Sequence, residues 1–189
     1  RVAIFFLQST ALFALLPLAA KQLPGGGAWA YTLLLASLGL GAVVAAFWLP
    51  RLRVLVTRDR LLRDGTLIQA LAMSGVGFAP NLWVAAAAMM IAGASWLTVV
   101  NILTVSSQLS LPDWVRARGM SIYMMTMMGA ASSSAALWGH VAGLVDVAWT
   151  YVAAACTGLV ALALTRRFHA GPEAALDLSP ARILQEPVP

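Results

Sequence analysis

Residues 82–109 read LWVAAAAMMIAGASWLTVVNILTVSSQL, a long run without Asp, Glu, Lys or Arg. A helix needs about 20 mostly apolar residues to cross the hydrocarbon core of a bilayer, and this run is longer than that. Asn81 precedes it, and Asn is a favoured N-cap residue. Apolar and polar residues do not alternate as in a barrel strand, so the run predicts a transmembrane helix.

Further apolar runs, bounded by charges, Pro or Gly, extend this pattern over most of the chain. Together they predict six spans, at residues 2–20, 29–49, 61–78, 82–109, 119–144 and 147–165. Most connections are short, so neighbouring spans must run antiparallel and pack together. The expected fold class is therefore an all-α integral membrane protein, with a six-helix transmembrane bundle over residues 1–167.

The composition agrees with this fold class. Of the 189 residues 61% are hydrophobic and 10% charged, whereas soluble domains are about half apolar and a quarter charged. The single Cys, Cys156, cannot build a disulfide scaffold or a metal site of Cys ligands. The net charge of +5 comes from basic residues placed between apolar runs and not from one patch. This pattern indicates a membrane, and no nucleic-acid partner is expected.

The distribution of basic residues predicts the orientation. Eleven of the 12 Lys and Arg fall on one side of the predicted bundle, and Lys21 alone falls on the other. By the positive-inside rule both termini of this segment are then cytoplasmic, and the location is a bacterial-type inner (plasma) membrane. Residues 168–189, which contain four Pro, are interpreted as a cytoplasmic tail. Six of the seven Trp lie near expected span ends, as in an aromatic belt.

The first span begins almost at once after Arg1, which is not an initiator Met. A signal peptide is one interpretation of residues 1–20, but they lack a good small-x-small cleavage site and further spans follow. We therefore expect the chain to be a piece of a longer protein.

Several segments, spread over nearly the whole chain, carry a resemblance to a known family. They are 15–18 (LLPL), 39–42 (GLGA), 49–53 (LPRLR), 111–119 (LPDWVRARG), 137–140 (LWGH) and 177–180 (DLSP). They resemble the C-terminal half of a major facilitator superfamily transporter, in the branch of enterobactin-exporter-like and multidrug efflux permeases. The resemblance implies twelve helices in two halves, so this chain would hold the seventh to the twelfth, with a missing N-terminal half of the same chain as partner.

The resemblance also implies a loop motif, G-x-x-x-D-[RK]-x-G-[RK]-[RK], between the eighth and ninth helices. Arg51 matches a basic position, but Pro50 stands where Asp is expected and Arg53 where Gly is expected. The loop is then most simply a topology determinant that contacts anionic lipid headgroups, and gating is the alternative. The charged residues assigned to these topology or gating loops are Arg51, Arg53, Asp113, Arg116 and Arg118.

Polar residues within the spans are the candidates for a substrate cavity. Thr98, Asn101 and Gln108 share one face of residues 82–109, with Thr104 close by. In the resembled family the first, fourth and fifth helices of this half contribute most of the central cavity. The expected cavity residues are Gln8, Trp96, Thr98, Asn101, Gln108, Thr126 and Ser133. The alternative is that Ser, Thr, Asn and Gln side chains bond across packed helices.

The resulting prediction is a secondary active exporter of small amphipathic or hydrophobic organic molecules, which works by alternating access around a midplane site. Protons are a candidate coupling ion. His140 is the one ionisable residue expected within the spans, so a titrating acid would belong to the missing half. No Gly-Lys-Ser/Thr run offers a phosphate-binding loop for ATP.

Two other classes of membrane protein are alternatives, an intramembrane serine protease and a channel. Ser95 and His140 suggest the protease, but Ser95 lies about 21 Å below the outer face and His140 near it, while base and nucleophile must approach within about 3 Å. No filter pattern marks a channel. Five Met between residues 120 and 128 could suggest a thioether copper site, but they spread around the helix and Met commonly fills helix interfaces. We expect no catalytic residue, no metal and no cofactor.

Overall fold

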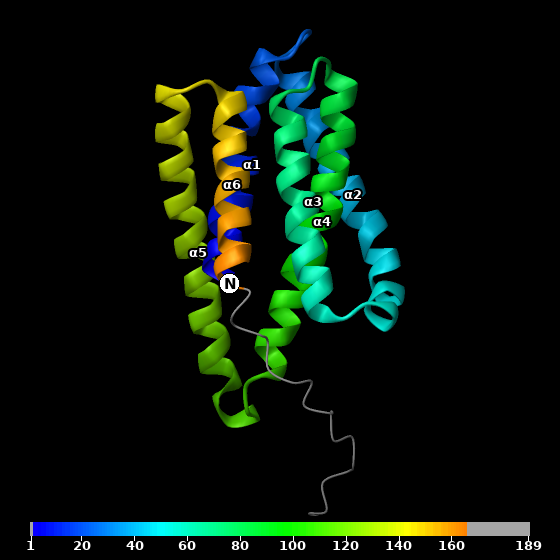
Figure 1. The fold of residues 1–189 in the computed structure, drawn as a ribbon, viewed down its shortest axis with the longest axis vertical. Helices are drawn as coiled ribbons and strands as arrows, with labels where there is room; N and C mark the ends of the chain where they lie inside the picture. The colour runs from blue at the N-terminus through cyan, green and yellow to red at the C-terminus, as the bar shows by residue number, and fades with distance from the viewer. Residues whose placement is uncertain (1, 166–189) are drawn as a thin grey trace, which may run out of the picture.

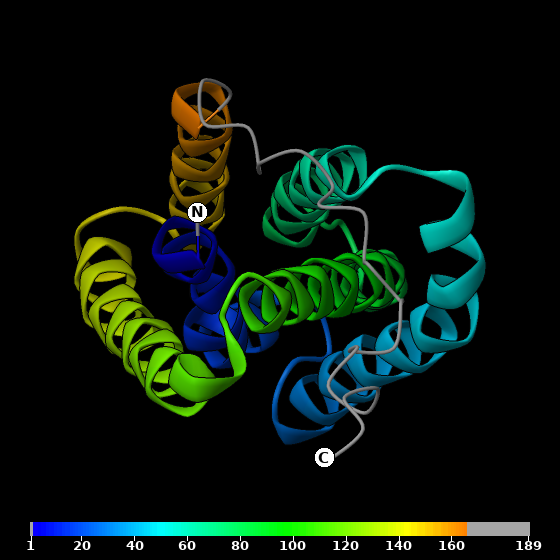
Figure 2. The ribbon, with the colours of Figure 1, turned by 90° about the horizontal axis from the view of Figure 1, so that it is seen from below.

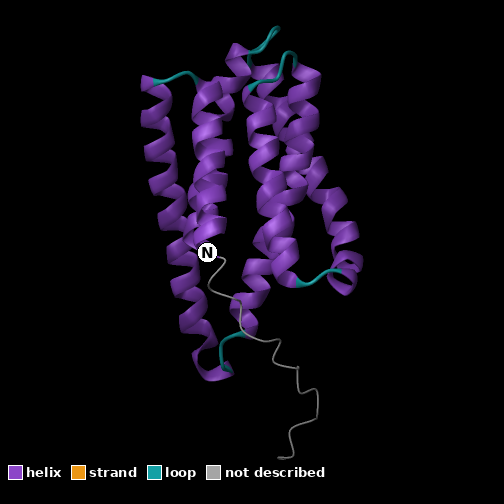
Figure 3. Ribbon diagram, viewed as in Figure 1, coloured by secondary structure: helices purple, strands orange, loops and turns teal. Residues whose placement is uncertain are grey.

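The computed structural model describes residues 2–165, and within that range it contains six α-helices and no strand (Figures 1 and 3). The expectation of an all-α membrane bundle is confirmed. Arg1 and the expected tail of residues 168–189, with its segment 177–180, lie outside the described residues. The helices are α1 (Val2–Gln22), α2 (Ala28–Leu55), α3 (Arg58–Gly77), α4 (Leu82–Leu109), α5 (Asp113–Leu144) and α6 (Val147–Thr165).

Four of these helices, α1, α2, α4 and α6, are long and apolar enough to cross a membrane. The other two are more polar: α3 opens with charged residues, and α5 begins with the sequence DWVRAR. Arg63 and Asp64 lie inside the range 61–78 and form an ion pair of 2.9 Å at the surface. The expectation that His140 is the one ionisable residue within the spans is therefore wrong, and the crossing of α3 and α5 stays a prediction.

The helices pack as a bundle in which α4 lies between α2 and α3. Helix α1 contacts α5 and α6, and α3 contacts both α4 and α6. Figure 2, which looks along the helices, shows α5, α6 and α1 on one side and α2 on the other, with α3 and α4 between them. The face of α2 that packs against the bundle consists of buried residues three or four apart, namely Ala30, Leu34, Leu38, Gly41, Ala45 and Leu49.

Glycines allow α2 and α4 to approach closely. A methyl group added at Gly41 would lie 2.7 Å from the carbonyl carbon of Met90, and one added at Gly93 would lie 2.8 Å from that of Leu38. Neither position therefore has room for any side chain. Small residues at such crossings are how membrane helices gain van der Waals contact, because lipid offers no hydrophobic drive for helix association.

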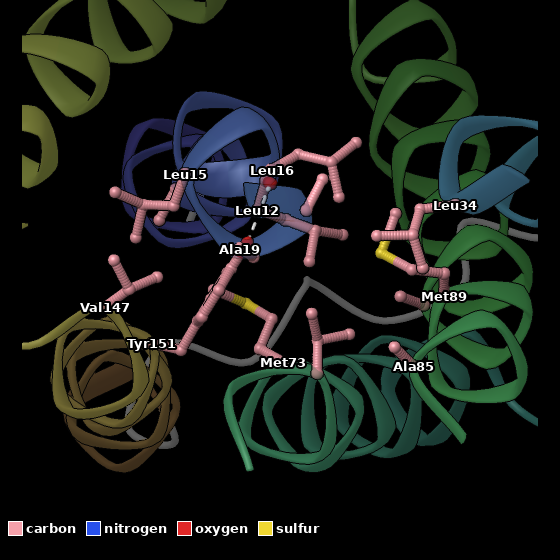
Figure 4. Close-up of a cluster of buried hydrophobic side chains, with 14 of the residues drawn as sticks. Leu12, Leu15, Leu16, Ala19, Leu34, Met73, Ala85, Met89, Val147 and Tyr151 are labelled. Carbon is pink, nitrogen blue, oxygen red and sulfur yellow. Dashed lines mark hydrogen bonds between the residues drawn. The ribbon is translucent and has the colours of Figure 1, made fainter. Parts of the chain in front are cut away.

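The main apolar core, part of which is drawn in Figure 4, joins side chains from all six helices, and α5 contributes Trp138. Leu12, Met73, Met89 and Tyr151 are fully buried there. The Tyr151 hydroxyl donates to the Leu12 carbonyl oxygen at 3.4 Å, so its polar atom has a partner. Since Leu12 belongs to α1 and Tyr151 to α6, the core ties the first helix to the last.

Side-chain caps hold two of the helix ends. The Asn81 Oδ1 accepts from the Val84 N–H at 2.9 Å, which confirms the expected N-cap of α4. At the start of α6 the Asp146 Oδ1 accepts from the Val147 N–H at 2.9 Å and from Gln22 Nε2 at 3.2 Å. The Asp146 carboxylate thus also joins the end of α1 to α6.

Candidate functional site

Asn101 and Arg53, which the sequence placed in different roles, lie together. The Asn101 side-chain oxygen accepts a hydrogen bond from an Arg53 guanidinium nitrogen. The bond connects α4 with the last turns of α2. An amide can orient a guanidinium group, but it carries no charge that would neutralise it. Asn101 is therefore engaged by a cation of the neighbouring helix.

The charged residues expected in loops lie on helices. Arg51 and Arg53 belong to the last turns of α2, and Asp113, Arg116 and Arg118 belong to the first turns of α5. Helix α2 continues past Pro50 because proline removes one hydrogen bond of the ladder without preventing helical turns after it. The placement in loops is thus wrong, although both groups lie at helix ends. The Arg51 guanidinium also stands 6.0 Å from the Trp48 ring centre, in cation–π range.

The threonines of α4 bond mainly within their own helix. Thr98 Oγ1 donates to the Ala94 carbonyl oxygen at 2.8 Å. Thr104 bonds in the same way to Val100 and lies 2.9 Å from the Tyr123 hydroxyl of α5. Gln108 is exposed near the end of α4. The Thr104–Tyr123 contact therefore brings α4 and α5 together.

Trp96 packs against α1. Its ring meets Phe13 edge to face, with ring centres 5.7 Å apart. It also borders a second buried cluster of Phe5, Phe6, Val99 and Leu103. Trp96 is only half-buried, so part of its ring remains accessible beside this cluster.

Gln8 is buried between α1 and α6. Its side chain is fully buried, and neither amide atom has a hydrogen-bond partner among the described residues. The amide packs on α6, where a methyl group added at Gly158 would lie 2.6 Å from Gln8 Nε2 and nearer still to its oxygen. Gly158 therefore makes room for the Gln8 side chain.

The two candidates on α5 both lie at the surface. Thr126 Oγ1 donates to the Ile122 carbonyl oxygen at 2.8 Å, and Ser133 is exposed. A methyl group at Gly129, on the same face, would meet no atom within 4 Å. This face of α5 is therefore exposed, carries only small side chains at these positions and is weakly polar.

An adjacent, buried strip of α5 holds contact residues that the sequence did not indicate. Ser134 Oγ and Trp138 Nε1 both donate to the Leu7 carbonyl oxygen of α1, at 2.7 and 2.9 Å. Trp138 is one of the six Trp expected near span ends as in an aromatic belt, but its side chain is buried inside the bundle, so for this residue the expectation is wrong. Ser134 and Trp138 are four residues apart and so lie on one face of the helix, and each carries a donor that needs an acceptor when it is buried. This spacing is the one sequence feature that could have indicated their shared contact.

Ser95 belongs to the contact of α3 with α4. Its hydroxyl donates to Gln69 Oε1 at 2.6 Å and is buried, whereas His140 is exposed on α5. The pair needed for a serine protease is thus not assembled in the described part of the chain. Residues 2–165 also hold no group of His, Cys, Asp or Glu suited to a metal ion.

A pocket of about 150 Å³ opens where α2 ends beside α4. Its walls are Arg53, Val56, Arg58, Ile102, Val105 and Ser106. Of the residues predicted from the sequence, only Arg53 lines it. The substrate-cavity candidates divide between interhelical contacts (Gln8, Trp96, Asn101), a half-buried threonine bonded within α4 (Thr98) and accessible positions (Gln108, Thr126, Ser133).

A family model described as a transmembrane secretion effector, of the major facilitator type, matches residues 1–188. No curated protein and no solved structure matches the chain. The family match covers all six helices.

Proposed function

The chain belongs to the transmembrane secretion effector family of major facilitator transporters, and we propose that it forms the C-terminal six-helix half of an exporter. Proteins of this kind are multi-pass membrane transporters that bind small-molecule substrates and lipids, and they are not enzymes. The direction of transport and the substrate class are part of the proposal.

The open face of α5 is the observation that supports a substrate surface. Thr126 and Ser133 lie on this face, and Gly129 leaves it without bulk. Tyr123 is buried on the adjacent strip of α5, and its hydroxyl lies 2.9 Å from that of Thr104, so α4 lies beside this part of α5. Hydroxyl groups on an otherwise apolar wall suit a small amphipathic or hydrophobic molecule better than a charged one.

Alternating access requires a second half, and the surface of the bundle is suited to one. Helix α2 exposes large apolar side chains, among them Val43, Val44 and Phe47. In the proposed protein such surfaces face either lipid or the N-terminal half. With proton coupling, the titrating acid would lie in that half, because the acidic residues described here lie near the ends of α3 and α5 and at Asp146. The proposed location is the inner membrane, with both termini of this segment cytoplasmic.

The test compares two faces of α5 in the full-length protein. Ser133→Phe places a large ring on the open polar face, and Ala135→Phe places the same ring on an exposed position nearly opposite around the helix. We expect Ser133→Phe to lower energised efflux of a lipophilic dye by about tenfold, a change of ~1.4 kcal/mol. Ala135→Phe should leave efflux unchanged at matched expression. Equal efflux from both variants would contradict the proposed substrate surface.

A further inference from the structure

The pocket at the end of α2 has an unusual concentration of positive charge. Arg53 and Arg58 contribute two guanidinium groups, and no carboxylate is among the six lining residues. Arg53 is held by the neutral Asn101 amide, so its charge is oriented but not neutralised. The Arg58 side chain makes no hydrogen bond or ion pair to any residue of the described range. The pocket therefore has uncompensated charge directed at a small volume.

Uncharged hydrogen-bond donors lie beside these two positive charges. The pocket includes the start of α3, a helix whose N-cap, Thr57, makes no side-chain capping bond. The first N–H groups of such a helix need an outside acceptor, and they favour an anion. The Ser106 hydroxyl, from α4, lines the same pocket and has no hydrogen bond to a described residue. Residues from three different helices thus contribute hydrogen-bond donors to the lining of this pocket.

We propose that this pocket binds the phosphate group of a phospholipid headgroup. Phosphate oxygens accept charge-assisted bonds from guanidinium groups, and they also accept from a hydroxyl and from helix N-terminal N–H groups. The surroundings favour a lipid over a soluble phosphate. Val54 and Leu55, next to the pocket on the last turn of α2, are 86% and 79% exposed and so offer an apolar surface for an acyl chain. Trp48 lies on the same helix before Val54 and Leu55, and its ring is in cation–π contact with Arg51. Trp side chains are enriched at the membrane interface, where lipid headgroups lie.

The test uses the full-length protein purified in a neutral detergent at about 0.15 M salt, where exposed charges more than about 8 Å apart are screened. Phosphatidylglycerol is titrated against the protein and binding is followed by native mass spectrometry. Diacylglycerol supplies the same chains without phosphate, and glycerol 3-phosphate supplies the phosphate without chains. The variants are Arg58→Gln, Ser106→Ala and, as a matched control, Arg60→Gln, which removes one positive charge from an exposed residue outside the pocket.

We expect Arg58→Gln to raise the apparent Kd for phosphatidylglycerol about tenfold, Ser106→Ala to raise it two- to threefold, and Arg60→Gln to change it less than about twofold. Arg58→Lys should recover part of the loss, which a folding defect would not. The thermal midpoint of each lipid-free variant reports folding separately. Equal losses in Arg58→Gln and Arg60→Gln would show diffuse attraction to the basic segment and overturn the pocket. Equal affinity for glycerol 3-phosphate, or for diacylglycerol, would overturn the phospholipid as occupant.

Discussion

The close crossing of α2 and α4 makes a prediction about two glycines on one helix. At Gly41 an added methyl group would lie 2.7 Å from the Met90 carbonyl carbon and closer to its oxygen, whereas at Gly39 it would meet no atom within 4 Å. Both positions lie within α2, so Gly→Ala should gain the same helix propensity, about 1 kcal/mol. The difference between the two variants then isolates the contact with α4.

The magnitude follows from the contact. The Met90 backbone cannot rotate away as a side chain could, so Gly41→Ala must push the helices apart and weaken packing along the whole crossing. Overpacking of this kind costs roughly 1–3 kcal/mol, and the upper end applies because the obstacle is backbone. After the propensity gain we expect Gly41→Ala to lower the free energy of unfolding by about 2 kcal/mol and Gly39→Ala to raise it by up to about 1 kcal/mol.

The assay is unfolding of the full-length protein in mixed micelles, followed by circular dichroism as denaturing detergent is added. The two midpoints should move in opposite directions. Gly93→Ala, whose methyl group would lie 2.8 Å from the Leu38 carbonyl carbon, should behave as Gly41→Ala does. Shifts of the same sign and size for Gly39→Ala and Gly41→Ala would refute the reasoning, because they would show that α4 does not limit the space at Gly41.

Three further substitutions test single contacts. Gln8→Met keeps the shape but removes a buried amide that has no hydrogen-bond partner within residues 2–165, so the free energy of unfolding should rise by about 1–2 kcal/mol in the same assay; a fall would show that the amide has a partner. Trp138→Phe removes the donor to the Leu7 carbonyl oxygen and should lower stability by about 0.6–1 kcal/mol, with exposed Trp83→Phe as the neutral control. Asn101→Asp should neutralise Arg53 and weaken phosphatidylglycerol binding about fivefold, whereas unchanged binding would exclude the Arg53 charge from lipid binding.

The sequence by itself determined the class of protein and the main helices. Long apolar runs can satisfy their backbone groups in lipid only as helices or closed barrels, and the absence of alternation left helices. The N-cap at Asn81 could also be predicted, because a cap depends on residues adjacent in the chain.

Tertiary structure alone decided which way each helix faces. In a soluble helix the apolar stripe marks the buried side, but in a membrane both lipid and core are apolar, so the pattern of hydrophobic residues does not identify the packed face. The sequence therefore did not show that Gln8 packs on Gly158, that Trp138 is buried against α1, or that Asn101 meets Arg53. These contacts join residues far apart in the chain, and their geometry depends on how closely the glycines let the helices approach.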